Sequence, residues 1–335
     1  MLYVGLDVHW KTASIHILDE NGKKVKAMTI RGGWDKMLAE LKTLPQPWSV
    51  CYEASCGYGV LYDQLSHWAS KVVVAHPGQT RLIFRTKRKN DRIDAQKLAK
   101  LLFLDEVPVV HVPSAQMRAW RELIEFRSRL VNRRVAVKNA LRALLRSYGV
   151  TMPRSLWSVK GRAWLESVTL PNRSAQIRQE LLLDDLRIAD SKIARVTAEL
   201  DAIADGSAAV TVLQTISGIG PRTAEAVAAY IDRPERFTKN HAIGAYFGLV
   251  PCQDASAGKN RLGHITREGP ATVRKLVVEA TWRVIALNPS VKAFFERIHH
   301  GKKDRRKIAL VATAHWLLRC MLAMLKTGEC WREAA

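Results

Sequence analysis

The fold class predicted by the sequence is an α/β domain at the N-terminus, followed by an α-helical coiled coil and a mainly α-helical C-terminal domain. Three observations predict it: short apolar strands fill the first 75 residues, a heptad repeat begins near residue 116, and helical patterns recur after residue 207. A chain of 335 residues has room for about two domains of ~150 residues. We expect the boundaries to divide it into residues 1–113, 114–206 and 207–335.

The N-terminal domain is expected to order its elements as βββαβαβ. Five segments have the β-rich, apolar composition of strands: residues 3–8, 13–17, 23–30, 48–53 and 71–75. Asn21-Gly22 is a hairpin signal between the second and third strands, and residues 34–44 and 58–68 have helical spacing. This is the order of the ribonuclease-H-like (RuvC-like) fold, in which parallel strands with crossover helices extend an antiparallel meander.

Two acidic residues lie at informative places in this order. Asp7 lies inside the apolar first strand, Glu53 is the last residue of the fourth, and these strands are neighbours in the predicted sheet. An acid within an apolar strand is costly to bury unpaired. Asp7 therefore has a salt-bridge partner, caps a turn or binds a cation, and the strand pattern leaves these alternatives open.

Two further acids follow within a basic run. Asn90 is the expected N-cap of a helix that ends near Phe103, and Asp91 and Asp94 share one face of its first turn. Acids at a helix N-terminus also favour the macrodipole without any metal. The neighbouring basic residues are Arg85, Lys87, Arg88, Lys89 and Arg92. Carboxylates beside such a run are typical of sites where Mg²⁺ and phosphate meet.

The positive charge of the chain is segregated. Its formal net charge is +22, with 53 basic and 31 acidic residues, and two blocks supply most of the surplus. Residues 81–150 contribute +11 and residues 258–307 contribute +9, whereas the rest of the chain is nearly neutral. Scattered lysines that only make a protein soluble would not be grouped in this way, so the sequence predicts a polyanionic partner.

The middle of the chain is predicted to form two long helices. Four apolar residues recur every seven positions in the first, over residues 116–149: Leu123, Leu130, Val137 and Leu144. The second, over residues 174–204, either folds back as an antiparallel hairpin or joins subunits. The first helix has nine basic residues against two acidic ones, Arg133 and Arg134 among them. This favours contact with a nucleic-acid backbone, although a solvated helix face looks similar.

Two glycine-containing segments follow in the C-terminal domain. Residues 213–230 have the form of a helix-hairpin-helix with a turn at Gly218–Gly220, which either presents backbone N–H groups to phosphate or is a packing hairpin. Residues 248–269 are expected to form a glycine-rich loop that contains Ser256. A loop serine is more often a turn residue than a nucleophile. Three basic residues of this loop are candidates to hold phosphates: Lys259, Arg261 and Arg267.

The sequence favours a reducing, cytoplasmic location without a membrane span. Its five cysteines form no C-x-x-C pair, and Asp7 interrupts the first apolar run, which does not fit a secretory signal. Residues 308–325 are apolar, but Arg319 lies inside them, and a central Arg costs roughly 2.5–3.5 kcal/mol on insertion scales. We expect a buried core helix with Arg319 on its solvent side.

Five short motifs, in their order and spacing, resemble those of the DEDD-type insertion-sequence transposases, the bridge-RNA-guided recombinases of bacteria. They are Gly5-Leu6-Asp7-Val8, Tyr52-Glu53-Ala54-Ser55-Cys56-Gly57, Lys89-Asn90-Asp91-Arg92-Ile93-Asp94-Ala95, Ile219-Gly220-Pro221, and Gly248-Leu249-Val250-Pro251 followed by Ser256. The resemblance covers almost the whole chain.

The resemblance implies roles for individual residues. Asp7, Glu53, Asp91 and Asp94 match the acidic tetrad of the family's nuclease domain and would bind a divalent metal, expected to be Mg²⁺. Ser256 matches the serine of its C-terminal transposase domain, the nucleophile that becomes joined to DNA. The family's serine is usually followed directly by glycine, whereas Ala257 intervenes here before Gly258.

The resemblance also implies partners and a location. The expected partners are a structured noncoding bridge RNA, whose loops pair with target and donor DNA, and further copies of the chain, as a dimer assembling to a tetramer. The tetrad and the serine would come from different subunits. We expect the protein in the bacterial cytoplasm, associated with the nucleoid when it acts.

Two other functions fit the same residues. One is a metal-dependent Holliday-junction-type nuclease that attacks with water, in which Ser256 only shapes a loop. The other is a non-catalytic RNA- or DNA-binding protein whose acids pair only with arginine.

Overall fold

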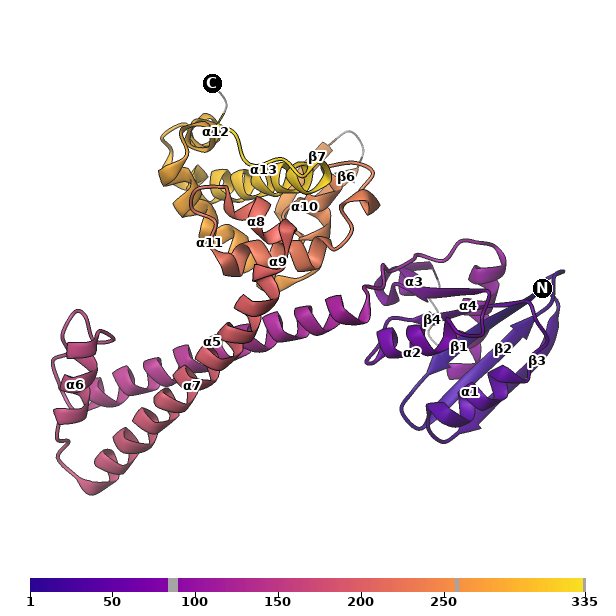
Figure 1. Ribbon diagram of the computed structural model, residues 1–335, viewed down its shortest axis with the longest axis horizontal. Helices are drawn as coiled ribbons and strands as arrows, with labels where there is room; N and C mark the ends of the chain where they lie inside the picture. The colour runs from indigo at the N-terminus through magenta and orange to yellow at the C-terminus, as the bar shows by residue number, and fades with distance from the viewer. Residues whose placement is uncertain (84–89, 257–258, 334–335) are drawn as a thin grey trace. The chain divides into compact units, whose positions relative to one another are not determined.

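A computed structural model describes residues 1–83, 90–256 and 259–333 of the protein. The chain forms two compact units, Met1–Arg118 and Ala119–Ala335, which we describe separately (Figure 1). The first unit holds the predicted α/β domain. The second holds two long helices and a helical C-terminal bundle.

The first unit is built on a five-stranded mixed sheet. Its strands are β1 (Leu2–Val8), β2 (Thr12–Leu18), β3 (Lys24–Arg31), β4 (Trp48–Glu53) and β5 (Lys71–Ala75), in the order β3-β2-β1-β4-β5. The first three pair antiparallel, whereas β4 pairs parallel with both β1 and β5. The predicted mixed α/β domain is therefore confirmed, including the neighbourhood of the strands that carry Asp7 and Glu53.

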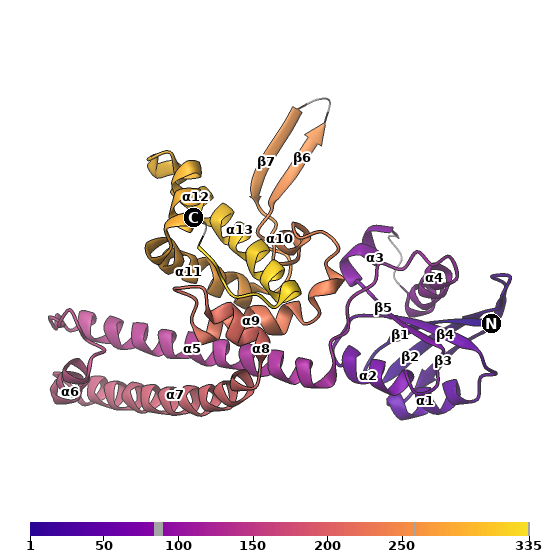
Figure 2. The ribbon, with the colours of Figure 1, turned by 45° about the horizontal axis from the view of Figure 1, so that its top comes forward.

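Helices cover both faces of this sheet (Figure 2). On one face, α1 (Trp34–Lys42) and α2 (Tyr58–Leu65) contribute Met37 and Leu61 to a core that includes Leu6 of β1. On the other, α4 (Asp91–Phe103) packs Leu98 against Cys51 of β4. A short helix that the sequence pattern did not predict, α3 (Pro77–Ile83), follows β5.

Gly5 allows α4 to approach β1 unusually closely. A Cβ built on Gly5 would lie 2.1 Å from the backbone oxygen of Ala95 and 2.4 Å from the backbone nitrogen of Ala99. Atoms at such distances overlap, and both belong to the backbone of α4, which cannot rotate out of the way. Glycine at this position therefore sets the distance between the helix and the sheet.

Two helices of 33 residues each, α5 (Ala115–Ser147) and α7 (Arg173–Asp205), form the long arm of the second unit. Arg127 of α5 donates to Thr197 of α7 at 2.7 Å, and Arg134 pairs with Asp190 at 3.2 Å. From the first pair to the second, the residue number rises by seven on α5 and falls by seven on α7. The two helices therefore run antiparallel, as Figures 1 and 2 both show. The fold-back alternative is the one that the structure adopts.

The far end of this hairpin has a small core of its own. The helix α6 (Val159–Ser167) lies between the two long helices in sequence and buries Leu165 against Leu144 and Leu145. Gln179 of α7 donates to the backbone oxygens of Leu165 and Val168, at 2.8 and 3.0 Å. These contacts fix the connection that turns the chain back.

The C-terminal bundle is arranged around one apolar helix, α13 (Arg306–Thr327), which packs on several others. They are α8 (Ala208–Gln214), α10 (Ala242–Tyr246), α11 (Ala271–Leu287) and α12 (Pro289–His299). Residues 303–327 are long and apolar enough to cross a membrane, but half of their most apolar stretch is buried inside the bundle. Arg319 is exposed, as expected for a core helix.

The turn between α8 and α9 (Pro221–Ile231) is packed against α11. Gly218 has a φ of +100°, and a Cβ there would lie 2.9 Å from the backbone nitrogen of Val284. The side chain of Asn288 donates to the backbone oxygen of Ser217 at 2.7 Å. Of the two interpretations of this helix-hairpin-helix pattern, these contacts favour the packing hairpin.

A polar network anchors α5 on the bundle. Arg121 donates to the backbone oxygens of Ala229 and Tyr230, at 2.8 and 3.2 Å. Glu125 accepts hydrogen bonds from the hydroxyls of Tyr230, at 2.8 Å, and Thr272, at 2.7 Å. These bonds bring the long helix, α9 and α11 together.

Glu225 is an ionisable group buried beside this anchor. It is 1% exposed, lies 3.2 Å from Arg222, and borders a cavity of about 90 Å³ that Arg127 also lines. Burial raises the pKa of its carboxyl to about 7, although Arg222 and Arg127 lower it. The folded chain therefore retains a proton that an unfolded chain loses near pH 4.5.

We predict that Gly5→Ala destabilises the first unit by about 1–3 kcal/mol, because α4 must move away from β1. Hydrogen exchange of peptides that cover α4 and β1 measures the loss of protection. Gly33→Ala is the matched control, since a Cβ at Gly33 meets nothing within 4 Å. Equal protection in the two variants would contradict the packing argument.

We predict that Glu225→Gln gains stability over the wild-type chain as the pH rises from 5 to 8. The pKa of Glu225 is raised on folding, so the contribution of this one carboxyl to wild-type stability is greatest below about pH 4.5, falls between pH 4.5 and 7, and is level above. Glutamine does not ionise, so the variant does not lose this part of the free energy of unfolding, which is on the order of 2–3 kcal/mol. Urea denaturation at each pH, followed by hydrogen exchange in α9 and α11, measures the difference. A difference independent of pH would contradict the prediction.

Candidate metal centre

The carboxyl ends of β1 and β4 bring Asp7 and Glu53 to the same part of the sheet. Leu6 pairs with Tyr52 in the parallel register, so Asp7 and Glu53 each follow one position later on adjacent strands. Successive side chains of a strand point to opposite faces. Leu6 and Tyr52 belong to the core under α1 and α2, so Asp7 and Glu53 belong to the face that α4 covers.

The amino end of α4 supplies the other two acids. Asn90 caps this helix, as predicted, by accepting a hydrogen bond from the backbone N–H of Arg92 at 3.0 Å. Asp91 and Asp94 lie in its first turn, and Asp94 pairs with Lys97 at 3.0 Å. Ala95 follows directly and lies over Gly5, so the close packing at Gly5 brings this turn to the end of β1.

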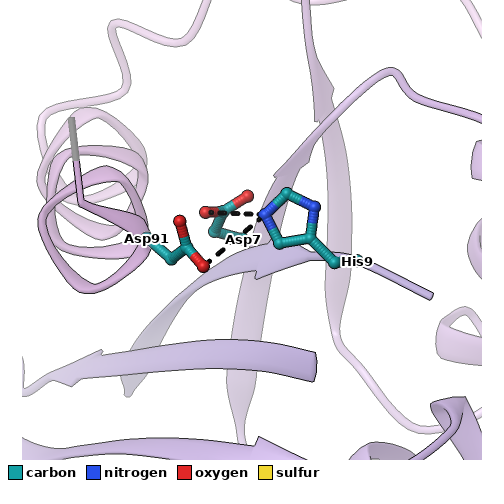
Figure 3. Close-up of side chains that lie close together, drawn as sticks. All are labelled: Asp7, His9 and Asp91. Carbon is teal, nitrogen blue, oxygen red and sulfur yellow. Dashed lines mark ion pairs between the residues drawn. The ribbon is translucent and has the colours of Figure 1, made fainter. Parts of the chain in front are cut away.

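Asp7, Asp91 and His9 converge on one point (Figure 3). One ligand atom from each lies within 4.8 Å of those of the other two. The Nε2 atom of His9 is 3.6 Å from Asp7 Oδ2 and 3.7 Å from Asp91 Oδ2. Two carboxylates and an imidazole nitrogen at this spacing are a donor set that fits a divalent cation.

The structure thus brings together two of the four predicted acids and adds a histidine that the sequence interpretation missed. Glu53 and Asp94 lie on the neighbouring strand and in the same helical turn, and their role as ligands stays a prediction. The signal for His9 was present in the sequence. A residue two positions after Asp7 lies on the same face as Asp7 if the chain stays extended.

The basic run before α4 is described only in part. Arg85, Lys87, Arg88 and Lys89 lie outside the described residues. Arg92 is exposed and donates through Nε to Thr29 Oγ1 of β3 at 3.3 Å. Its position at the amino end of α4 leaves it beside Asp91.

Ser256 lies on a β-hairpin, not in the irregular loop that we expected. The hairpin consists of β6 (Pro251–Ser256) and β7 (Lys259–Ile265), and Figure 2 shows it extending from the C-terminal bundle. Ser256 is the last residue of β6 and pairs with Lys259 across residues 257–258, which lie outside the described chain. The alternation of residues over 251–256 and 259–265 is short and polar, so apolar periodicity did not reveal these strands.

The other two basic candidates of this segment are exposed. Arg261 pairs with Asp254 in the hairpin register. Arg267 follows the hairpin with a φ of +58°, and its backbone N–H donates to the Gly248 oxygen at 3.2 Å. Their positions leave both guanidinium groups accessible, and their contact with phosphate stays a prediction.

The nine basic residues of the first long helix divide into two groups. Six contact residues outside this helix: Arg118 with Asp63, Arg121 with Tyr230, Arg127 with Thr197, Arg134 with Asp190, and Lys138 and Arg142 with the Trp157 ring. The other three are exposed, and one of them also lies over the ring of Phe126 in the same helix: Arg133, Arg146 and Arg129, the last being the one over the ring. Much of this charge therefore stabilises the fold. The residues of this helix that stay candidates for contact with phosphate are the three exposed arginines.

Two protein-family models match parts of the chain. Residues 4–150 match a family model of DEDD transposases of the IS110 type, described as transposase, and residues 210–296 match a second, described as transposase of the IS116/IS110/IS902 family. The chain is 30% identical to a Pseudomonas aeruginosa protein named "Probable family 20 transposase", over 73% of this chain and 74% of that protein.

Two further relatives have names of the same kind. The transposase for insertion sequence element IS1111A of Coxiella burnetii is 27% identical over 82% of this chain and 75% of its own length. The transposase for insertion sequence element IS1328 of Yersinia enterocolitica is 27% identical over 82% of this chain and 81% of its own length.

We predict that Asp7→Asn weakens divalent-metal binding by on the order of 100-fold, because it removes a charged donor from the point where three donors converge. Isothermal titration with Mn²⁺ measures the affinity. Asp35→Asn is the control, since Asp35 is an exposed acid in the first turn of α1 in the same unit. Unchanged affinity in Asp7→Asn would show that the metal binds elsewhere.

Proposed function

This chain belongs to the IS110/IS116 family of DEDD transposases, enzymes that cleave and recombine DNA, and we propose that it exchanges DNA strands through a covalent phosphoserine intermediate at Ser256. The observation that carries the proposal is the convergence of Asp7 and Asp91 at the end of β1, with Glu53 on the adjacent strand. Such a site fits an enzyme that acts on phosphate esters with a divalent metal.

The acidic site would hold the metal on the α4 face of the sheet. Asp7 and Asp91 supply oxygen donors, and Glu53 and Asp94 complete the tetrad in the proposal. A DEDD domain implies divalent-metal use, and we propose Mg²⁺ or another divalent ion. When bound, such an ion polarises the scissile phosphate and stabilises the attacking and leaving oxygens. The carboxylates also repel one another unless a cation lies between them.

Ser256 would perform the nucleophilic step. A serine hydroxyl is a weak nucleophile at neutral pH and needs a base or a metal to remove its proton. Its Oγ attacks the scissile phosphorus, the phosphorus–oxygen bond to one sugar breaks, and that sugar oxygen leaves and takes up a proton. The new phosphoserine bond replaces the broken ester, so the reverse attack by a different sugar hydroxyl rejoins DNA without an energy source.

The proposed partners are a structured noncoding bridge RNA and the target and donor DNA. The support is the net charge of +11 over residues 81–150 and +9 over residues 258–307, which flank the second half of the tetrad and Ser256. Backbone phosphates bind such surfaces without sequence preference, so base pairing with the RNA would choose the DNA site. Arg133, Arg261 and Arg267 are exposed candidates for these contacts.

A homo-oligomer completes the proposal. The tetrad lies in residues 1–118 and Ser256 in residues 119–335, and both must reach one phosphate. We propose that the tetrad of one subunit acts with the serine of another, in a dimer that assembles to a tetramer on nucleic acid. We propose that the reaction takes place in the bacterial cytoplasm, at the nucleoid.

We predict that Ser256→Ala abolishes the covalent protein–DNA species, because the oxygen that forms the bond is removed. The measurement is a denaturing gel with end-labelled element DNA, the flanking noncoding RNA and Mg²⁺. Gln253→Ala, a change to an exposed residue of the same hairpin, should retain the species.

The same gel separates the alternatives. Free nicked DNA from Ser256→Ala, absent with Asp7→Ala, would replace the serine mechanism by attack of water at a junction nuclease. Metal-independent binding with no cleavage by the wild-type chain, unchanged in Asp91→Asn, would indicate a binding protein only.

A further inference from the structure

His9 is fixed beside the acidic site by the backbone. It follows β1 directly, and its N–H donates to the backbone oxygen of Thr12 at 2.8 Å, which closes the turn into β2. Its side chain lies on the face of Asp7, with 56% of its surface exposed. Figure 3 shows the ring directed toward both carboxylates, one from the sheet and one from α4.

The distances around the ring nitrogen fit a shared ion better than hydrogen bonds. Nε2 is 3.6 Å from Asp7 Oδ2 and 3.7 Å from Asp91 Oδ2, whereas hydrogen bonds from nitrogen to oxygen span about 2.7–3.2 Å. Two donors that share one ion at about 2.1 Å are separated by about 3.0 Å when they are adjacent in an octahedron and about 4.2 Å when opposite. Both observed distances lie inside this interval.

We propose that His9 is a ligand of the divalent metal, which gives the site one nitrogen donor among its carboxylates. This inference rests on the metal use of the DEDD site and adds a residue outside the acidic tetrad. Mg²⁺ prefers oxygen donors, whereas imidazole suits transition ions such as Fe²⁺, Ni²⁺ and Zn²⁺. Mn²⁺ shares the preference for oxygen, but as a transition ion it binds an imidazole nitrogen more readily than Mg²⁺ does. His9 therefore shifts the preference of the site from Mg²⁺ toward Mn²⁺.

The alternative is that the imidazole acts as a cation that neutralises the two carboxylates when no metal is present. The two roles have opposite consequences. A ligand adds to metal affinity, so its removal weakens binding. A competing cation occupies the place of the metal, so its removal strengthens binding.

The first experiment compares Mn²⁺ and Mg²⁺ binding to the wild-type chain and His9→Gln by calorimetry. The proposal predicts that the dissociation constant for Mn²⁺ rises about tenfold or more, and that the constant for Mg²⁺ changes less than about threefold. His67→Gln, an exposed histidine of the same unit, is the control and should leave both constants unchanged. Tighter binding of either ion to His9→Gln would overturn the proposal.

The second experiment observes the bond itself. Electron spin-echo spectra of Mn²⁺ bound to the wild-type chain should contain a ¹⁴N coupling that shifts when histidine is labelled with ¹⁵N and disappears in His9→Gln. The Asp7→Asn variant separates two claims: that the acidic site binds the metal, and that His9 is one of its ligands. If Asp7→Asn loses Mn²⁺ but the wild-type spectrum has no nitrogen coupling, the role of His9 is wrong and the metal site stands. If the wild-type chain and Asp7→Asn bind Mn²⁺ equally, the site itself is wrong.

Discussion

The contact between Gly5 and the backbone of α4 is the constraint on which the rest of the candidate site depends. Asp7 lies two residues beyond Gly5 on β1, and Asp91 lies one turn before Ala95 on α4, so the contact between Gly5 and Ala95 determines how far apart the carboxylates are. Asp7 is held by the backbone of β1 and Asp91 by the backbone of α4. The distance between their carboxylates therefore changes only if the whole helix moves relative to the strand. The helix lies flat on β1 only because the strand has no side chain at that point.

This packing assembles like charges, which is costly unless something offsets it. Asp7 and Asp91 approach within 4.8 Å of one another, and carboxylates at such a distance favour a cation between them. Among the described residues, the ammonium of Lys97 pairs with Asp94, and the Nε2 atom of His9 lies 3.6 and 3.7 Å from oxygens of Asp7 and Asp91. The fold thus gathers acidic side chains where the end of β1 meets the amino end of α4.

Part of the positive charge of the chain stabilises the fold. On α5, six basic side chains contact carboxylates, carbonyl oxygens, a hydroxyl or an aromatic ring of the same protein, and they help fix the antiparallel pair and its anchor on the C-terminal bundle. Of the nine basic side chains of that helix, only Arg129, Arg133 and Arg146 are exposed. A net charge computed from composition therefore overstates the surface available to phosphate, because composition does not distinguish an arginine that packs from one that is solvated.

Local patterns in the amino-acid sequence were enough to predict the strand order, the long helices, the N-cap at Asn90 and the adjacency of the strands that carry Asp7 and Glu53. These features follow from periodicity, glycine and proline positions and capping residues, which act over a few neighbouring residues. The folded structure was needed to show which segments meet in space: α7 folds back on α5, the turn at Gly218 packs on α11, Ser256 ends a hairpin strand, and His9 lies beside Asp7 and Asp91. Such choices depend on the packing of segments far apart in the chain, and local patterns do not encode the distance between them.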